Sequence, residues 1–550
     1  MIRTEDKKGR SCCTLCPAMC EVRVAPSGPD TYRSEYPLQN SGGVCPRGSS
    51  LAELLSCRGR IVEPARRVSD RWVPVDLQSA CREIIRSAAG KAVTILLDGN
   101  VAVEQLTAAA AWCRAWDGAS LCLVGAPAEE QMLLGFEGSG AKYLDNDGLS
   151  DCDGFVVIGD AFSANPTCAS AVFDRRAGEP ATPLVVIDAA AGKASKFATH
   201  LVALDPGTEL GALSAVIRAA GADADVPAAV LAGDDTSVTP SAKVAGAAIA
   251  KCRKLGILIA AEYGRCNAWR QIGFLAGRLA EARGGGIAPQ THGANALAAV
   301  RLARKLGAVS LASALSSDDT VRVAVGCDVL GMLGLQEPAI PAVAAALPNV
   351  TSESAQVVLP VAMAGEIGGT YLSAGARKLR VAPLLPAPAG VPEPAEVVAE
   401  LARAAGASAP VGAAEALAGE PLGPAEPSAA PAWSDPAPLV LLLGRQAMHA
   451  GCGELTAGGS WQAVVQPEAE LRISPPDAQA AGIDNLAFVT VRAGANAVRA
   501  RVRFAPELAR GVIVLPEGLP STRRLVPSSI DPDNDTITAT PVAAEVIAGE

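Results

Sequence analysis

Short apolar runs alternate with longer amphipathic segments between about residues 78 and 350. The apolar runs predict buried strands, and the segments between them, in which apolar residues recur every three or four positions, predict helices. The strand-like runs lie at 92–97, 120–124, 154–159, 183–188, 256–261 and 321–327. Near-continuous apolar strands separated by helices are typical of parallel sheets covered by helices. The pattern therefore predicts an α/β architecture.

The pattern changes after residue 405. Residues 406–437 are dominated by Ala, Pro and Gly without hydrophobic periodicity, which predicts a semi-extended surface linker. Beyond it, short strand-like runs follow one another at 438–443, 463–465, 470–473, 487–491 and 511–515. Short strands at this spacing predict a small β-barrel.

Composition and charge narrow the class of protein. With 550 residues the chain is too long for one core, and its 49% hydrophobic and 19% charged residues are typical of globular domains. The net charge of −10, without a basic stripe, argues against nucleic acid as a partner. No apolar run approaches the roughly 20 residues of a membrane helix, and residues 1–8 have no apolar signal core, so we expect a cytoplasmic protein.

Four cysteines near the amino terminus carry the clearest chemistry. Cys13, Cys16, Cys20 and Cys45 are separated by two, three and 24 residues. Three local thiolates and a distant fourth suit a [4Fe–4S] cluster. A four-cysteine zinc site is the alternative, but it usually has two separate pairs of cysteines, so the spacing favours iron–sulfur ligation. Cys12, beside Cys13, is the spare cysteine.

Two predicted strands end in residues that suit a ligand. Gly159 and Asp188 close strands at the carboxyl edge of the expected sheet, where ligands of such sheets bind. Glycine lets a ligand approach the backbone, and an acidic side chain can pair with a ribose or a guanine edge. Ordinary α/β turns also use these residues, so the two positions alone leave both interpretations open.

The cysteine arrangement resembles the amino-terminal domain of the molybdopterin oxidoreductase family, which includes formate dehydrogenases, nitrate reductases and the large peripheral-arm subunit of respiratory complex I. The runs at 60–67, 72–76, 200–209, 349–371, 444–449 and 471–483 resemble further motifs of the family, in the family's order. The resemblance implies a multidomain α/β protein with an amino-terminal Fe–S domain, two parallel-sheet α/β domains and a carboxyl-terminal β-barrel of the double-psi type.

The resemblance also implies a domain layout. Residues 1–70 would form the cluster domain, 71–225 together with 350–405 one α/β domain, and 226–349 a second α/β domain. The linker at 406–437 would then lead to a molybdopterin dinucleotide-binding-like barrel at 438–550.

The cofactors implied by the resemblance are the [4Fe–4S] cluster and a bis(molybdopterin guanine dinucleotide) with molybdenum or tungsten. Arg47 takes the place of a lysine that stands between cluster and pterin in many relatives. The positions matching the family's cofactor contacts are Gly159, Asn165, Asp188, Gly207, Thr208, Gly326, Glu366, Gly369, Thr370, Arg377, Gly444, Arg445, His449 and Asp477. The chain departs from the family where the arginine after Asp188 is missing and where the 373–379 run keeps only Arg377.

The protein ligand of the molybdenum or tungsten is the weakest part of the match. Cys122 is the cysteine in the plausible place, but Leu121 and Leu123 flank it. That apolar context favours the alternative of a buried strand cysteine.

Two functions of different class remain. The first is an oxidoreductase subunit, formate dehydrogenase-like, that passes electrons between the pterin site and a partner Fe–S or flavin protein through the cluster. The second is a non-catalytic electron-transfer or scaffold subunit like the complex I homologue, without pterin. The altered 373–379 run favours the second, whereas Asp188 and the 444–449 run favour the first. The small-molecule substrate, the choice between Mo and W, and the oligomeric state do not follow from the sequence.

Overall fold

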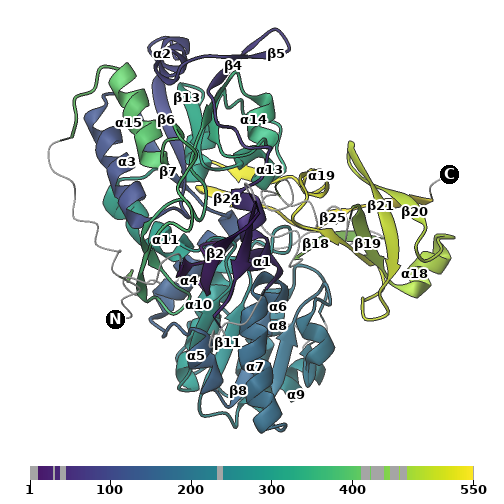
Figure 1. Ribbon diagram of the computed structural model, residues 1–550. Coiled ribbons are helices and arrows are strands. Elements are labelled where there is room, and N and C mark those ends of the chain that lie inside the picture. Colours follow the sequence, from purple (N-terminus) through teal and green to yellow (C-terminus); the bar gives the residue numbers. More distant parts are fainter. Residues whose placement is uncertain are drawn as a thin grey trace.

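The computed structural model describes residues 10–28, 31–37, 45–202, 204–231, 240–410, 421–422, 439–445, 458 and 467–548. Two α/β domains lie one above the other, the barrel lies to one side, and the amino-terminal sheet lies between them (Figure 1). In the part of the chain that is described, no helix is long and apolar enough to cross a membrane.

The amino-terminal segment forms a small antiparallel sheet followed by a helix. Its strands are β1 (Arg10–Cys12), β2 (Glu21–Gly28) and β3 (Thr31–Glu35), and the helix is α1 (Pro46–Leu55). Cys13, Val22 and Leu51 pack together with Ala346 and Met363 of the first α/β domain. The segment is therefore anchored through its apolar side chains to the larger domain.

The first α/β domain is built on a seven-stranded sheet with the order β5-β4-β15-β14-β13-β6-β7. Its strands are β4 (Ala65–Val68), β5 (Arg71–Pro74), β6 (Ala92–Asp98), β7 (Ala119–Val124), β13 (Thr320–Val325), β14 (Ala342–Ala345) and β15 (Val357–Pro360). The five strands from β15 to β7 are parallel, and the β4–β5 hairpin is antiparallel at one edge. Helix α15 (Pro394–Ala404) packs against α2 (Leu77–Ser87) and α3 (Val103–Ala115).

The second α/β domain is built on a five-stranded parallel sheet with the order β10-β9-β8-β11-β12. Its strands are β8 (Gly154–Ile158), β9 (Leu184–Ile187), β10 (His200–Val202), β11 (Leu255–Ile259) and β12 (Gly286–Pro289). Helices α7 (Pro166–Gly178), α8 (Glu209–Ala220), α9 (Pro240–Ile249) and α10 (Trp269–Ala282) belong to this domain.

Helices α4 (Pro127–Ser139) and α10 make a close contact that requires glycine. A Cβ atom at Gly135 would lie 1.8 Å from the Arg270 carbonyl oxygen, and one at Gly273 would lie 2.2 Å from the Met132 carbonyl oxygen. Because α4 follows a strand of the first sheet and α10 belongs to the second domain, this contact helps to join the two α/β domains.

The sheets divide the chain differently from the expected layout. Strands β8, β9 and β10, from the 71–225 segment, form one sheet with β11 and β12 from the 226–349 segment. Strand β13, also from 226–349, pairs instead with β6, with Thr320 opposite Ala92. The second domain is thus one continuous insertion between β7 and β13. Pairing between strands from distant segments decides which strands share a sheet. The sequence does not show the boundary, because the apolar runs on both sides of residue 225 look alike.

The carboxyl-terminal domain is the expected barrel, a nearly closed sheet with the order β25-β18-β22-β19-β21-β20-β26. Its strands are β18 (Val440–Gly444), β19 (Ala469–Ile473), β20 (Phe488–Ala493), β21 (Asn496–Phe504), β22 (Val512–Pro516), β25 (Val542–Ala543) and β26 (Glu545–Ala548). The predicted strand at 463–465 and most of the predicted linker lie outside the described residues. The β23 (Ser529–Asp531) and β24 (Thr536–Thr538) hairpin leaves the barrel and packs on α12 (Leu311–Ser316) of the first domain.

Candidate functional site

A tight loop presents three of the four amino-terminal cysteines. The Cys13 N–H donates to the Cys20 carbonyl oxygen at 2.9 Å, and the Met19 N–H donates to the Cys16 carbonyl oxygen at 3.2 Å. Met19 has a left-handed φ of 46°, which turns the chain back toward β2. Cys45 caps the amino terminus of α1, where its sulfur accepts a hydrogen bond from the Gly48 N–H at 3.4 Å.

The four thiols lie near one another. All six pairs among Cys13, Cys16, Cys20 and Cys45 interact electrostatically. Burial raises the pKa of Cys13, Cys16 and Cys20, and the neighbouring sulfurs add to the rise. No three His, Cys, Asp or Glu side chains within the described ranges converge on the position of a single metal ion. Cys13 and Cys16 are buried, and Cys20 and Cys45 are partly buried, so the set offers soft donors in a largely enclosed place.

Arg47 lies between these cysteines and a large cavity. The side chain is buried at 3% exposure, and its guanidinium donates to the carbonyl of Ala164 in the second α/β domain. The guanidinium acts electrostatically on the Cys16 thiol, and the residue also lines the cavity. The family resemblance implied a place for Arg47 between a cluster and a pterin, and that role stays a prediction.

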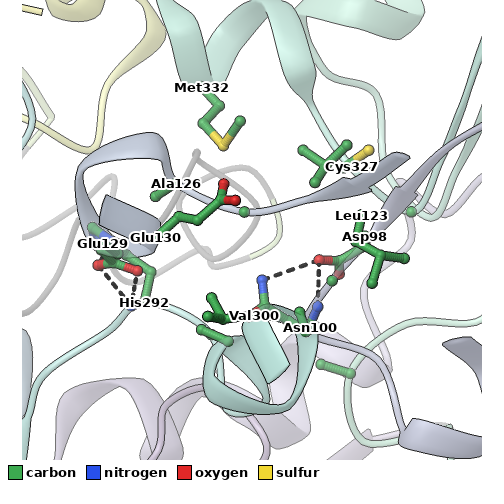
Figure 2. A pocket seen from close by; sticks show the side chains of 18 of the residues that line it. Asp98, Asn100, Leu123, Ala126, Glu129, Glu130, His292, Val300, Cys327 and Met332 are labelled. Atoms are coloured by element: carbon green, nitrogen blue, oxygen red, sulfur yellow. Dashed lines mark hydrogen bonds and ion pairs between the residues drawn. The ribbon is translucent and has the colours of Figure 1, made fainter. Parts of the chain in front are cut away.

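The cavity opens at the carboxyl edge of the first sheet. The ends of β6, β7 and β13 contribute Asp98, Val124 and Gly326, and α4 and α11 (Ala296–Leu306) supply further walls (Figure 2). Its empty volume is about 1350 Å³, which includes space open to solvent.

Three residues that line the cavity carry buried polar atoms that lack a hydrogen-bond partner among the described residues: Thr14 Oγ1, Arg47 Nε and Asp328 Oδ2. A buried polar atom without a partner costs about 1–3 kcal/mol. A bound group rich in hydrogen-bonding atoms, with negative charge near Arg47, would offset that cost. The cavity therefore fits a polar organic cofactor of the pterin type.

Among the carboxyl groups that line the cavity, those of Asp98 and Glu130 have raised pKa values (Figure 2). Burial raises the pKa of Asp98 to about 6, although its Oδ1 accepts hydrogen bonds from the Asn100 N–H at 2.9 Å and the Asn100 side-chain amide at 3.0 Å. Burial, with a smaller contribution from Asp535 of the β23–β24 hairpin, raises the pKa of Glu130 to about 7. Both groups can hold a proton at the cavity wall near neutral pH.

These raised pKa values predict that stability falls as pH rises. Between the ordinary glutamate pKa of 4.5 and about 7, the unfolded chain has released the Glu130 proton while the folded chain still holds it. We expect the free energy of unfolding to drop between pH 5 and pH 8, and Glu130→Gln to remove on the order of 2 kcal/mol of that drop. The free energies of unfolding of wild-type and Glu130→Gln protein, measured with denaturant at pH 5 and pH 8, test this expectation. An equal drop in both proteins would contradict it.

At the second sheet, the polar side chains predicted to contact a ligand form hydrogen bonds with other groups of the protein. Asp188 accepts hydrogen bonds from the backbone N–H groups of Ala190 at 2.9 Å and Gly192 at 2.6 Å. Asn165 caps α7 and accepts from both the N–H and the hydroxyl of Thr167. Gly159 has a φ of 71°, and the Ala260 carbonyl oxygen would lie 2.5 Å from a Cβ atom there.

A buried ion network follows the same edge. Arg265 lies 3.1 Å from a Glu262 carboxylate oxygen and 3.4 Å from Asp188, and its Nε donates to the Leu443 carbonyl of the barrel at 3.0 Å. The Arg445 backbone N–H donates to Glu262 at 3.4 Å. Burial raises the pKa of Glu262 to about 8, while Arg265 counteracts part of the rise.

The network continues from Arg445 toward the cavity. The Arg445 guanidinium pairs with Glu129 and donates to the Gln290 carbonyl at 2.8 Å. His292 lies 2.7 Å from Glu129 and 3.5 Å from Glu517 of the barrel. Arg445, an expected pterin contact that belongs to the barrel, thus already contacts residues of both α/β domains.

Sequence reasoning missed most of this network, whose members are Glu129, Glu262, Arg265, His292, Glu517 and Arg523. One signal was available, because Glu262 and Arg265 follow directly after the apolar run at 256–261, where a strand end is expected. The other members belong to no recognised motif.

Most other predicted residues lie away from the cavity in structural roles. Glu366 pairs with Arg60 at 2.6 Å, and the Thr370 N–H, beside Gly369, donates to Glu104 at 2.7 Å. Gly207 and Thr208 directly precede α8, and Gly444 ends β18. Within the barrel domain, the Asp477 carboxylate accepts a hydrogen bond from the Gly511 N–H. The largely exposed Arg377 forms an ion pair with Asp145. His449 lies outside the described residues.

Cys122, the candidate metal ligand, packs into the hydrophobic core. It is fully buried in β7 among Leu96, Leu311 and Leu330. Burial raises the pKa of its thiol far above the ordinary value. Of the predicted residues, the structure brings Arg47 and Gly326 to the cavity, where Gly326 has a φ of 77°.

Comparisons with known proteins bear on the whole chain. Residues 439–543 match the family model of the Molydopterin dinucleotide binding domain. The fold resembles that of acetylene hydratase from Pelobacter acetylenicus, with a TM-score of 0.69 and 11% sequence identity over 98% of this chain and 100% of that chain. No curated protein sequence matches the chain. At 11% identity the structural likeness establishes a shared fold.

Proposed function

We propose that the chain is a member of the molybdopterin oxidoreductase family, a subunit that exchanges electrons between a molybdenum- or tungsten-pterin site and a partner protein through a [4Fe–4S] cluster. The observation that carries the proposal is that four cysteines with this spacing lie near one another and beside Arg47, which also lines the cavity. Four thiolates with one distant member suit cubane ligation.

Each residue at the site has a defined part in the proposal. Cys13, Cys16, Cys20 and Cys45 hold the cluster as thiolates, so their buried thiols release protons when it binds. Arg47 offsets the negative charge of the thiolates and holds an anionic cofactor by charge-assisted hydrogen bonds. When bound, the pterin metal supplies two-electron redox chemistry, and Asp98 and Glu130 hold protons at the cavity wall.

The substrate and the partner are the finer parts of the proposal. Formate is the first substrate to test, because formate dehydrogenases are among the proteins that the amino-terminal cysteine spacing resembles. The electron partner would be an Fe–S or flavin protein. Acetylene hydratase is named for a hydration. For this chain, the four neighbouring cysteines favour electron transfer.

A second candidate is a subunit that carries electrons without a pterin. The placement of Cys122 favours it, since this thiol faces the hydrophobic core and supplies no ligand to the cavity. The family resemblance includes such members, in which the fold is kept for scaffolding.

Metal analysis of protein purified without air separates the candidates. We expect about four irons and one molybdenum or tungsten per chain, in keeping with one cluster and one pterin metal. Iron without molybdenum or tungsten would favour the carrier, and zinc as the sole metal would overturn both candidates.

A further inference from the structure

We propose that His292, oriented by Glu129, accepts the proton that a substrate releases when it is oxidised in the cavity. The inference rests on the proposed function and names the residue that takes the proton of that reaction. His292 follows β12 and precedes α11, and it lines the cavity together with Glu129 of α4 (Figure 2). Imidazole is the side chain most often used for proton transfer near neutral pH, because its ordinary pKa lies there.

The backbone around His292 is held in place. Its N–H donates to both carboxylate oxygens of Glu129 at 3.0 Å. The Thr291 hydroxyl donates to the Gly293 carbonyl oxygen at 2.9 Å. The Asn100 side chain packs so closely on Gly293 that a Cβ atom at that position would overlap it. The imidazole is therefore presented to the cavity from a fixed support, as proton transfer requires.

The carboxylate of Glu129 decides which ring nitrogen carries the proton. Nδ1 of His292 lies 2.7 Å from Oε1 of Glu129. Burial acts to raise the pKa of Glu129, but His292 and Arg445 outweigh it and lower this pKa to about 2, so the oxygen is ionised and accepts. Nη2 of Arg445 lies 3.2 Å from the same ring nitrogen, and we assign the Nδ1 proton to the shorter contact with the carboxylate. The neutral ring then carries its lone pair on Nε2, which is the basic atom.

Charged side chains from α4 and the barrel flank the ring. Nε2 of His292 lies 3.5 Å from Oε1 of Glu517, and the Glu129 and Glu517 side chains are 4% and 2% exposed. Arg445 pairs with Glu129. Arg523 pairs with Glu517 at 2.9 Å. Two buried carboxylates and two guanidinium groups therefore offset one another around the ring, and Glu517 is near enough to attract the proton that Nε2 takes up.

With formate as the probe substrate, the atoms and electrons of the step balance. The C–H bond of formate breaks, and its two electrons pass to the oxidised pterin metal of the proposed function. The proton binds to Nε2 of His292, and carbon dioxide leaves. The His292 side chain is 17% exposed, so water reaches the ring and takes the proton before the next turnover.

Oxidation of formate with a viologen dye, catalysed by holoprotein purified without air, tests the inference. His292→Gln keeps a side-chain donor for Glu129 but has no atom that takes up a proton near neutral pH. We expect its kcat to fall about 100-fold or more, while iron and molybdenum or tungsten stay at wild-type levels. His200→Ala, in the edge strand β10 of the second sheet, is the matched control and should keep the full kcat. Full turnover by folded His292→Gln protein would overturn the inference and leave the proposed function standing.

A second variant separates proton transfer from a structural role. His292→Ala leaves space for a small base, so imidazole added to the buffer should restore part of its lost kcat and leave the wild-type kcat unchanged. An inactive His292→Ala protein that keeps its metals and gains nothing from imidazole would contradict the inference. Wild-type holoprotein that contains the pterin metal but oxidises no formate would overturn both the formate assignment and this step.

Nitrogen NMR of the histidine rings gives a readout that does not depend on turnover. The chain contains three histidines, so the signals of His292 are identified by their absence from His292→Gln protein. We expect the neutral ring to carry its proton on Nδ1, as the contact with Glu129 requires. A neutral ring with its proton on Nε2 would have no basic atom at that position and would overturn the inference.

Discussion

Cys20→Ala should abolish the broad visible absorbance of the proposed [4Fe–4S] cluster and leave protein with less than one iron per chain. The residue supplies one of four thiols that interact electrostatically in every pair, and its backbone carbonyl closes the loop by accepting from the Cys13 N–H. Removing one ligand leaves a cubane with an open iron corner, which solvent and oxygen can reach. Absorbance spectra and iron analysis of anaerobically purified variant and wild-type protein measure the loss.

Cys12→Ala is the matched control for that experiment. Cys12 adjoins Cys13 in the sequence but belongs to strand β1, and burial together with the charge of Glu21 raises the pKa of its thiol to about 11. A cysteine that serves only as a partly buried side chain is expendable for ligation, so the spectrum and the iron content should match those of the wild type. Loss of the cluster in Cys12→Ala, with retention in Cys20→Ala, would reassign the ligands.

Arg60→Met should lower the free energy of unfolding by about 3–5 kcal/mol, because it leaves a buried carboxylate without its cation. The Arg60 guanidinium makes two hydrogen bonds to Glu366, at 2.6 and 3.0 Å, and the side chains are 5% and 1% exposed. Glu366 also accepts from the Met363 N–H at 2.9 Å. Denaturant unfolding of variant and wild-type protein with equal iron content measures the change.

Two comparisons sharpen this second experiment. Arg380→Met removes an ion pair with Glu104 in which the arginine side chain is 76% exposed, and it should cost less than about 1 kcal/mol. The double variant Arg60→Met, Glu366→Leu removes both buried charges and should recover part of the lost stability. Equal costs for the Arg60 and Arg380 variants would show that burial does not control the strength of these pairs.

The parts of the molecule that the sequence predicted well depend on local patterns. Apolar runs such as those ending at Asp98 and Gly159 form the buried strands β6 and β8, since a continuous apolar run needs cover on both faces. The barrel follows from its short, closely spaced strands, and its match to the dinucleotide binding domain agrees with the resemblance seen around Asp477. The spacing of the four cysteines predicted a [4Fe–4S] site, which stays a prediction, and the structure places these cysteines near one another.

The sequence alone determined the α/β character of the chain, the barrel and the group of cysteines, because each depends on residues that are close together in the chain. Only the tertiary structure decided which strands share a sheet, and it placed Cys122 in the core and joined Glu262, Arg265 and Arg445 across 183 residues of sequence. The physical reason is that strand pairing and buried ion pairs are interactions between distant segments. Packing of the whole chain determines which segments become partners, so a local sequence pattern cannot predict them.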